Sequence, residues 1–384
     1  RNGINGTYVN SLALINGSLY FSGSIGNDAT DPHTFSLWKT DGTQAGTELA
    51  DPTEFTVGWG GSTFLGVVNG NAVFEGTDFA HGTEPWALPL NSPLPSYITA
   101  SSGAVYTYDD SSGALNLTSG TFTFTADNTT APLINLTASG PASGVFFDTG
   151  EHLAGLALTG GAQATMLSLG SARTHSNHNV LVIGTLGSAN DPTFSIDSTS
   201  KLDLTNNDLI VHTGSSDQGN GVPDPAGVPE TNELAAVRAL AATGRGVAPG
   251  SVLNGTWTGN GLTSSAAASA DSKAGIEQIV LAVVQNSDQI LGKLSKWTVG
   301  ASSESLGSND ILVKYTYNGD AALEGFVGDN SVTIVNGSYD AGKSTQANWA
   351  FGDFTGNGKV DDNDITILNG LYGNGTAGSG LPQL

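Results

Sequence analysis

The chain has 384 residues and carries 35 acidic against 12 basic side chains, which gives a formal net charge of −23 at pH 7. A negative field of this size repels phosphate groups, so nucleic acids and anionic membrane surfaces are disfavoured as partners. The sequence has no cysteine, which removes disulfides, thiolate metal sites and cysteine nucleophiles from consideration. Its longest apolar run, IVLAVV at 279–284, is too short to span a bilayer.

Two similar segments open the chain, LINGSLYFSGS at 14–24 and VVNGNAVFEGT at 67–77. Each places an Asn-Gly pair between two runs of β-forming residues, which predicts a hairpin, and a further strand containing a tryptophan follows. The alignment pairs Phe21 with Phe74 and Trp38 with Trp86. The repeat length of about fifty residues is typical of propeller blades.

These segments resemble the Trp/Asp-Gly-Thr repeats of large bacterial surface proteins, which are propeller-like, and Asp41-Gly42 supplies the Asp-Gly turn. Two units are fewer than the roughly four blades that a closed propeller needs. We therefore expect an incomplete sheet completed by a partner, with a small β-sandwich as the alternative. Three prolines at 88–96 predict a stiff linker and a domain boundary near residue 96.

Residues 104–212 read as eleven short strands of alternating polarity, separated by Gly, Asn, Asp or Ser. This spacing favours a β-solenoid or a β-sandwich. Leu-x-Leu pairs place two apolar side chains on one face of a strand, so we expect one face to be buried. These pairs are Leu115 and Leu117, Leu156 and Leu158, and Leu202 and Leu204.

The middle region resembles the autotransporter-associated β-repeats that precede dockerin-like tails in bacterial surface proteins, planctomycetes among them. The segments KLDLTNNDLIV at 201–211, TWTGNGLTSSAAA at 256–268 and ILVKYTYNGD at 311–320 look like the carboxy-terminal module of the same family. The resemblance covers roughly residues 145 to 375 and implies a secreted or cell-surface setting.

A proline-containing loop at 214–232 leads into a predicted helix from about Asn232 to Thr243, with Gly244 as its stop signal. The stretch GIEQIVLAVV at 275–284 is compatible with a helix or a buried strand, and its Ile and Val content favours the strand.

The tail contains GDFTGNGKVDDNDITIL at 352–368, in which oxygen-bearing side chains occupy positions 1, 3, 5, 9 and 12 of a loop that turns at Gly358. Calcium prefers six to eight oxygen ligands, and this spacing supplies them, with a backbone carbonyl at position 7. An Asx-rich turn that caps the following helix is the alternative. The predicted Ca2+ ligands are Asp353, Thr355, Asn357, Lys359 (through its carbonyl), Asp361 and Asp364.

An earlier copy of this loop lies thirty-three residues upstream (353 − 320 = 33), beginning at Asp320. Ala322, Gly328 and Ser331 replace the oxygen donors at positions 3, 9 and 12, so we expect the first loop to be poor in metal. Apolar residues recur at three- and four-residue spacing after each loop, which predicts two short helices that pack face to face.

The paired loop-helix unit resembles the type I dockerin domain, over about the last sixty residues. Dockerins bind cohesin modules and attach proteins to a scaffold, with loop positions 10 and 11 contributing to recognition. Here those positions hold Asp329-Asn330 and Asp362-Asn363 in place of the hydroxyl pair of the best-known clostridial dockerins. The resemblance implies calcium as the cofactor and another protein as the partner.

Candidate catalytic or metal-binding groups elsewhere are sparse. His175 and His178 fit either a metal pair or a polar turn, and the pairs Glu151-His152 and His81 with Glu84 lie in turn-like contexts. No nucleophile elbow or phosphate loop occurs in the sequence. We therefore assign no catalytic residues and expect a protein that is not an enzyme.

Together these patterns predict a mainly β chain with propeller-like repeats at 1–96, a β-solenoid or β-sandwich with one inserted helix at 97–318, and a small helical dockerin-like EF-hand tail at 319–384. The expected role is an extracellular or cell-surface assembly protein, such as a surface-layer, fibre or filament subunit, that binds other protein subunits. A carbohydrate-binding adhesin that presents Trp38, Trp59 and Trp86 to surface glycans is one alternative. The non-catalytic part of a scaffold-anchored polysaccharide hydrolase is another.

Overall fold

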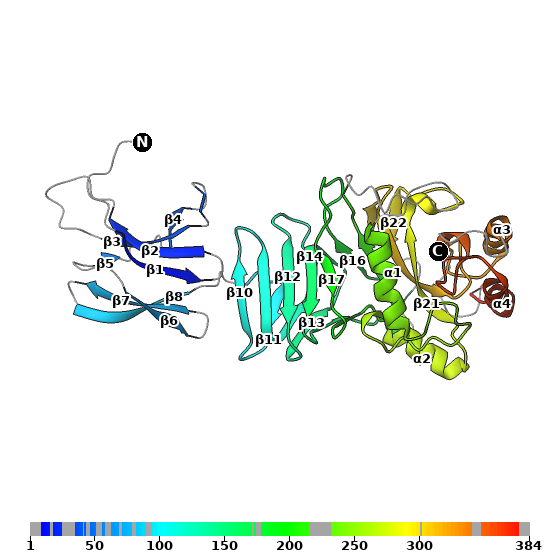
Figure 1. The fold of residues 1–384 in the computed structure, drawn as a ribbon, viewed down its shortest axis with the longest axis horizontal. Coiled ribbons are helices and arrows are strands. Elements are labelled where there is room, and N and C mark those ends of the chain that lie inside the picture. The colour runs from blue at the N-terminus through cyan, green and yellow to red at the C-terminus, as the bar shows by residue number, and fades with distance from the viewer. Residues whose placement is uncertain are drawn as a thin grey trace. The chain divides into compact units, whose positions relative to one another are not determined.

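The computed structural model describes most of the chain and shows a mainly β fold (Figure 1). Contacts divide the chain into two compact units, Arg1–Ser92 and Pro93–Leu384. The finer division at residues 96 and 318 stays a prediction. The described residues are 9–15, 18–24, 35–40, 42–43, 47–50, 56–57, 63–68, 71–78, 82–89, 94–170, 173, 178–214, 232–299, 302–339 and 347–375.

The first unit contains two antiparallel sheets. The first sheet is built from β1 (Val9–Ile15), β2 (Ser18–Ser24), β3 (Phe35–Thr40), β4 (Glu48–Leu49) and β5 (Thr56–Val57). The second sheet is built from β6 (Thr63–Val68), β7 (Asn71–Asp78) and β8 (Gly82–Pro89).

The aligned residues of the repeat occupy matching places in the two sheets. Phe21 lies opposite Trp38 on neighbouring strands, and Phe74 lies opposite Trp86. The strand pattern predicted for each repeat is therefore confirmed in the described residues. The Asn-Gly pairs, Asp41, His81 and Trp59 lie outside them.

The second unit begins with a run of short strands. All eleven predicted segments are strands, with 114–118 and 121–126 joined into one. They form β10 (Val105–Asp109), β11 (Ala114–Phe124), β12 (Ile134–Ser139), β13 (Ser143–Phe147), β14 (Glu151–Thr159), β15 (Gln163–Met166), β16 (Val180–Ile183), β17 (Phe194–Ile196), β18 (Lys201–Asp203) and β19 (Asp208–Val211); β9 (Ile98–Ala100) precedes them.

Two parallel ladders start from β11 and stack their side chains in register. One runs through β12, β14, β16 and β19, and the other through β13, β15, β18 and β20 (Gly261–Thr263). Leu115, Leu136 and Leu156 are consecutive partners in the first ladder, and all three are fully buried. Stacked apolar side chains of this kind fill the space between the two ladders. The predicted burial of one face of each strand is therefore confirmed.

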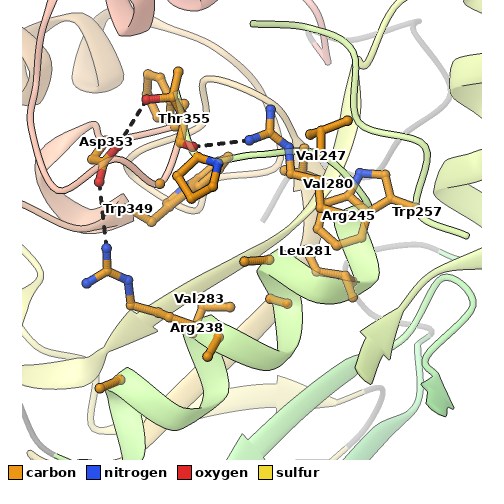
Figure 2. A pocket seen from close by; sticks show the side chains of 17 residues that line it. Arg238, Arg245, Val247, Trp257, Val280, Leu281, Val283, Trp349, Asp353 and Thr355 are labelled. Atoms are coloured by element: carbon orange, nitrogen blue, oxygen red, sulfur yellow. Dashed lines mark hydrogen bonds and ion pairs between the residues drawn. The ribbon is translucent and has the colours of Figure 1, made fainter. Parts of the chain in front are cut away.

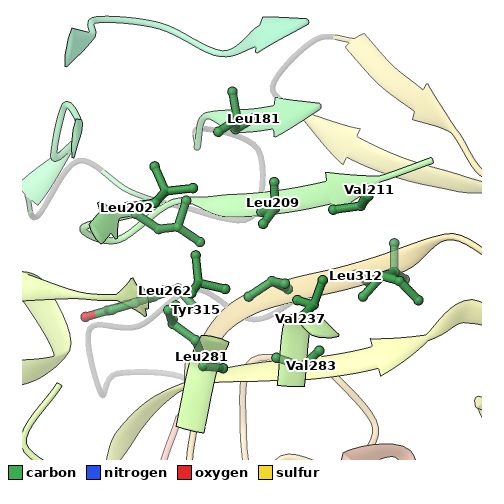
Figure 3. Close-up of a cluster of buried hydrophobic side chains, with 14 of the residues drawn as sticks. Leu181, Leu202, Leu209, Val211, Val237, Leu262, Leu281, Val283, Leu312 and Tyr315 are labelled. Carbon is green, nitrogen blue, oxygen red and sulfur yellow. The ribbon is translucent and has the colours of Figure 1, made fainter. Parts of the chain in front are cut away.

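The sheet turns back on itself at β11 and comes close to closing like a barrel. At one end, β24 (Ile311–Tyr317) runs antiparallel to β19 and pairs with β21 (Ile279–Gln285). Helix α1 (Asn232–Arg245) contacts both end strands, β20 and β21. Figure 3 shows Val237 of α1 among buried side chains from β19, β21 and β24.

The predicted helix and the predicted strand at 275–284 are both confirmed, with one correction. Gly244 does not stop α1 but lies in its last turn, where a Cβ atom would come 1.8 Å from the Leu262 carbonyl oxygen. The chain leaves the helix at Gly246, whose φ of +77° suits glycine. Gly244 therefore serves the close approach of α1 to β20.

The remaining elements are short. They are α2 (Ser265–Ala274), η2 (Asn286–Asp288), the hairpin of β22 (Lys296–Val299) and β23 (Ser302–Ser305), and in the tail α3 (Asp329–Ser338), η3 (Trp349–Phe351) and α4 (Asp362–Leu371). None of the helices in the described residues has the length and apolar character that a membrane crossing requires.

Candidate functional site in the paired loops of the tail

The two loops of the tail turn in the same way. In the second loop, Asp353 accepts hydrogen bonds from the backbone N–H groups of Asn357 (3.1 Å) and Gly358 (2.8 Å). In the first loop, Asp320 accepts equivalent bonds from positions 5 and 6, at 2.9 and 2.7 Å. The glycine at position 6 has a φ of +81° in both loops, a conformation that glycine adopts without strain.

The two helices that follow the loops are joined by a reciprocal pair of side-chain hydrogen bonds. Tyr339 donates to Asp362 at 2.7 Å, and its repeat equivalent Tyr372 donates to Asp329 at 2.6 Å. Helices α3 and α4 also contact one another directly. The thirty-three-residue repeat in the sequence is thus matched by an approximate two-fold relation between the loop-helix copies.

The six predicted ligands all lie in the second loop, with Asp353, Thr355 and Asp364 buried and Asn357, Lys359 and Asp361 half-buried. Asp364 reaches back across the loop and accepts from the N–H groups of Phe354 (2.9 Å), Thr355 (3.0 Å) and Asp361 (2.9 Å). Asp361 in turn accepts from the N–H of Asn363 and caps α4. The helix-capping interpretation therefore describes part of what this loop does.

In the part of the chain that the structure describes, Arg238 is the one basic side chain paired with the buried carboxyl groups of the second loop. Burial raises the pKa of Asp364 to about 7, and the nearby charge of Asp353 adds to the effect. Burial also raises the pKa of Asp353, while the Arg238 guanidinium, whose nitrogen lies 3.6 Å from Asp353 Oδ2, opposes that rise. A loop that gathers buried carboxylates in this way favours a cation.

The chemistry of the donor set fits calcium, because every candidate ligand supplies oxygen. Asp353, Thr355, Asn357, Asp361 and Asp364 would hold the ion through their side chains and Lys359 through its carbonyl. Among the described residues, no group of three or more His, Asp or Glu side chains is already arranged around a metal position. The carboxylates bond instead to backbone N–H groups of their own loop, so ion binding would require these side chains to adjust.

Two arginines of α1 hold the start of the second loop against the sheet (Figure 2). Arg245 forms a buried two-point ion pair with Glu277 (2.6 and 2.5 Å) and donates a further bond to the carbonyl of Thr355 at 3.3 Å. Arg238 lies about two turns earlier on the same face of α1. It forms an ion pair with Asp353 and donates a hydrogen bond to the carbonyl of Ala347. A cavity of about 490 Å³ lies between α1, β21 and this loop.

The sequence did not single out these arginines, although one signal was present. The chain has only 12 basic residues, and two of them stand seven positions apart on one helix, which places them on the same face. Their partners lie far away in sequence, since Thr355 follows Arg245 by 110 residues. Spacing within the tail carries no information about such contacts.

The first loop lacks the donors of the second, as the sequence showed. Asp320 accepts a further bond from the Thr316 hydroxyl at 2.5 Å, and Glu324 at position 5 accepts from Asn330 at 2.6 Å. Ser331, at the position equivalent to Asp364, is fully buried, and its hydroxyl has no hydrogen-bond partner among the described residues.

The histidines considered as candidate metal or catalytic groups pair, where the structure describes them, with carboxylates outside the tail loops. His178 is buried with its Nε2 3.5 Å from Asp208, and His152 bridges Asp127 and Glu304. Trp38 and Trp86 are half-buried in the first unit. His175 lies outside the described residues, as do His81 and Trp59, so the choice between a metal pair and a polar turn for His175 and His178 is not tested.

Comparison with protein-family models, with curated proteins and with solved structures finds no match for this chain.

Proposed function

We propose that this protein is a non-catalytic assembly unit of an extracellular or cell-surface structure, and that calcium stabilises its dockerin-like tail for attachment to other protein subunits. The observation that carries the proposal is the second tail loop. It buries Asp353 and Asp364 together, raises the pKa of both carboxyls, and places one guanidinium at 3.6 Å as the counter-charge. A divalent cation would relieve this repulsion.

The rest of the second unit suits a rigid spacer. Two parallel in-register ladders support the β-solenoid interpretation over the β-sandwich, because a sandwich is usually built from antiparallel strands. The net charge of −23 suits calcium-rich surroundings, where cations screen the repulsion between copies. In this proposal the solenoid carries the tail at one end and the propeller-like repeats precede it in sequence.

The test is calorimetric titration of calcium into the full-length, metal-free chain. We expect one site per chain, and Asp353→Asn or Asp364→Asn should each weaken binding by roughly tenfold or more, because each removes ligand charge. Saturating calcium should also raise the melting temperature, by the equivalent of about 2.7 kcal/mol when calcium exceeds the Kd a hundredfold.

Ser331→Ala is the matched control, since Ser331 holds in the first loop the position that Asp364 holds in the second. It should leave calcium affinity and stoichiometry unchanged. The proposal fails if the unaltered chain binds calcium no better than the Asp353→Asn/Asp364→Asn double variant, or if chelation leaves the melting temperature unchanged.

A further inference from the structure

The two sheets of the first unit each have a front and a back face. In the first sheet, the front face is formed by Ala13, Ile15, Tyr20 and Leu37, all of them buried. Residues that lie opposite each other on neighbouring strands point to the same face. The back face is therefore formed by Leu12, Leu14, Leu19, Phe21 and Trp38. These definitions follow from the alternation of side chains along each strand.

The repeat assigns the same two faces to the second sheet. The offset between the Asn-Gly pairs is 69 − 16 = 53 residues, so Leu19 and Phe21 correspond to Ala72 and Phe74. Ala72 and Phe74, on the back face, are 0% and 1% exposed. They share one hydrophobic cluster with Ala13, Ile15, Tyr20 and Leu37.

The two sheets therefore pack front to back: the front face of the first covers the back face of the second. This contact joins two different surfaces. Within the described residues, the back face of the first sheet and the front face of the second therefore take no part in it. A self-complementary contact, front to front or back to back, would leave two identical surfaces instead. The first unit thus has the arrangement of two consecutive members of a repeating array.

The unused back face of the first sheet is apolar and open. Leu12 is 64% exposed and Leu14 is 75% exposed, while Leu19, Phe21 and Trp38 are half-buried. At equivalent positions, the front face of the second sheet carries small or slender residues and one exposed carboxylate, Glu75, which lies opposite Pro85. Gly66 and Val73 are half-buried, and Pro85 and Ala87 are exposed. Large apolar side chains on one surface and small ones on the other are suited to interlocking contact.

We propose that the back face of the first sheet binds the front face of the second sheet of another copy of this chain, repeating between chains the contact already made within one. The proposal rests on the assembly function above and names its partner, a second copy. Because the contact joins unlike surfaces, it generates either a ring or an open filament.

The test uses two full-length variants, each blocking one surface, in analytical ultracentrifugation. Leu19→Lys places a charge on the back face of the first sheet, at the position equivalent to Ala72, which is 0% exposed in the contact within one chain. Pro85→Arg places one on the front face of the second sheet, at the position equivalent to Leu37, which is 2% exposed there. The unaltered chain should form a ring or filament that grows in population with concentration. Each variant alone should be monomeric, and an equal mixture should form a one-to-one complex that grows no further, because one intact surface remains on each partner.

Val105→Lys is the matched control, since Val105 is an apolar strand residue that is 56% exposed and belongs to β10 of the second unit, so it forms part of neither surface. It should assemble as the unaltered chain does, and circular dichroism should show the same fold for all three variants. A monomeric unaltered chain at every concentration, or a mixture of Leu19→Lys and Pro85→Arg that forms no complex, would overturn the proposal. Dimers of Pro85→Arg alone would also overturn it, because they would reveal a back-to-back contact.

Calcium titration of the Leu19→Lys variant separates this proposal from the one on the tail. Monomeric Leu19→Lys with unchanged calcium binding supports both proposals. Normal calcium binding by a chain that never assembles contradicts only the inference drawn from the first unit.

Discussion

At the scale of single residues, Glu151 and His152 begin β14 and face opposite sides of it. Glu151 is 1% exposed, and its carboxyl oxygens make no hydrogen bond to another side chain among the described residues. Burial raises its pKa to about 8, and the charge of Asp127 adds to the rise. Burial lowers the pKa of His152, but bonds to Asp127 (2.9 Å) and Glu304 (3.1 Å) outweigh this and raise it to about 9.

Glu151 should make the fold less stable as the pH rises. The unfolded chain releases the proton near pH 4.5 and the folded chain near pH 8, so between these values the folded state binds more protons and unfolding becomes easier with rising pH. Glu151→Gln should remove much of this slope and stabilise the protein at pH 8 by on the order of a few kcal/mol. Urea unfolding from pH 4.5 to 9 measures it.

His152 adds a slope of the same sign over a different range. Its stabilising charge is fully present below pH 6.5 and is lost as the pH rises through 9, so part of the pH dependence should survive in Glu151→Gln. Asp148→Asn, which removes an exposed carboxyl nearby in sequence, is the control and should leave the slope unchanged. A slope equally steep in Glu151→Gln would show that burial of Glu151 is not its source.

At the scale of elements, the strands were predictable and their partners were not. Alternating side chains located β10 to β19, because each strand has one buried face whatever lies next to it. The pairing of β11 with both β12 and β13 depends on contacts across the core, which alternation does not encode. Helix α2 was missed because its sequence, SAAASADSKA, has no apolar periodicity; only the Ser264 cap and Gly275 marked its ends.

Gly244 was identified from sequence as important to α1, but for the wrong reason. A helix stop requires only a left-handed conformation, whereas Gly244 gives room for the backbone of Leu262 in β20. Gly244→Ala should therefore destabilise the protein by about 1–3 kcal/mol or more through overpacking at this contact. Thermal or urea unfolding measures the loss.

Gly337 offers a control of the same chemical type. It lies inside α3 with nothing within 4 Å of the position that a Cβ atom would take. Gly337→Ala should stabilise the tail by about 0.5–1 kcal/mol, because alanine favours helix over glycine. If both variants lose similar stability, the close approach of α1 to β20 is not the cause of the Gly244 effect.

At the scale of the whole chain, the candidate calcium loop was predictable from spacing within twelve residues, but its place in the fold was not. The sequence predicted a tail separate from the sheet. The structure places the second loop against α1 and the segment that follows it. Arg245 of α1 donates to the Thr355 carbonyl, and the Gly250 N–H beyond the helix donates to the same oxygen at 3.1 Å. These contacts join segments about a hundred residues apart, which no local pattern reveals.

Calcium should therefore stabilise more than the loop that holds it. We expect calcium to slow amide hydrogen exchange in the second loop and α4, and also in α1 and β20, because α1 is fixed to the loop by Arg245 and to β20 by close packing. Mass spectrometry of exchange with calcium and with chelator measures this. Protection limited to residues 353–371 would contradict the coupling.

The closed ends of the parallel ladders have a consequence for solubility. Fibrous aggregates grow by adding strands to the open edge of an in-register sheet. A ladder whose last strand had an open edge could therefore pair with strands of other molecules. Here β9 and β10 run against β11 at the start, and α1 lies against β20 and β21 at the finish. We expect these antiparallel strands and this helix to hinder strands of neighbouring molecules from adding to the aligned ladders.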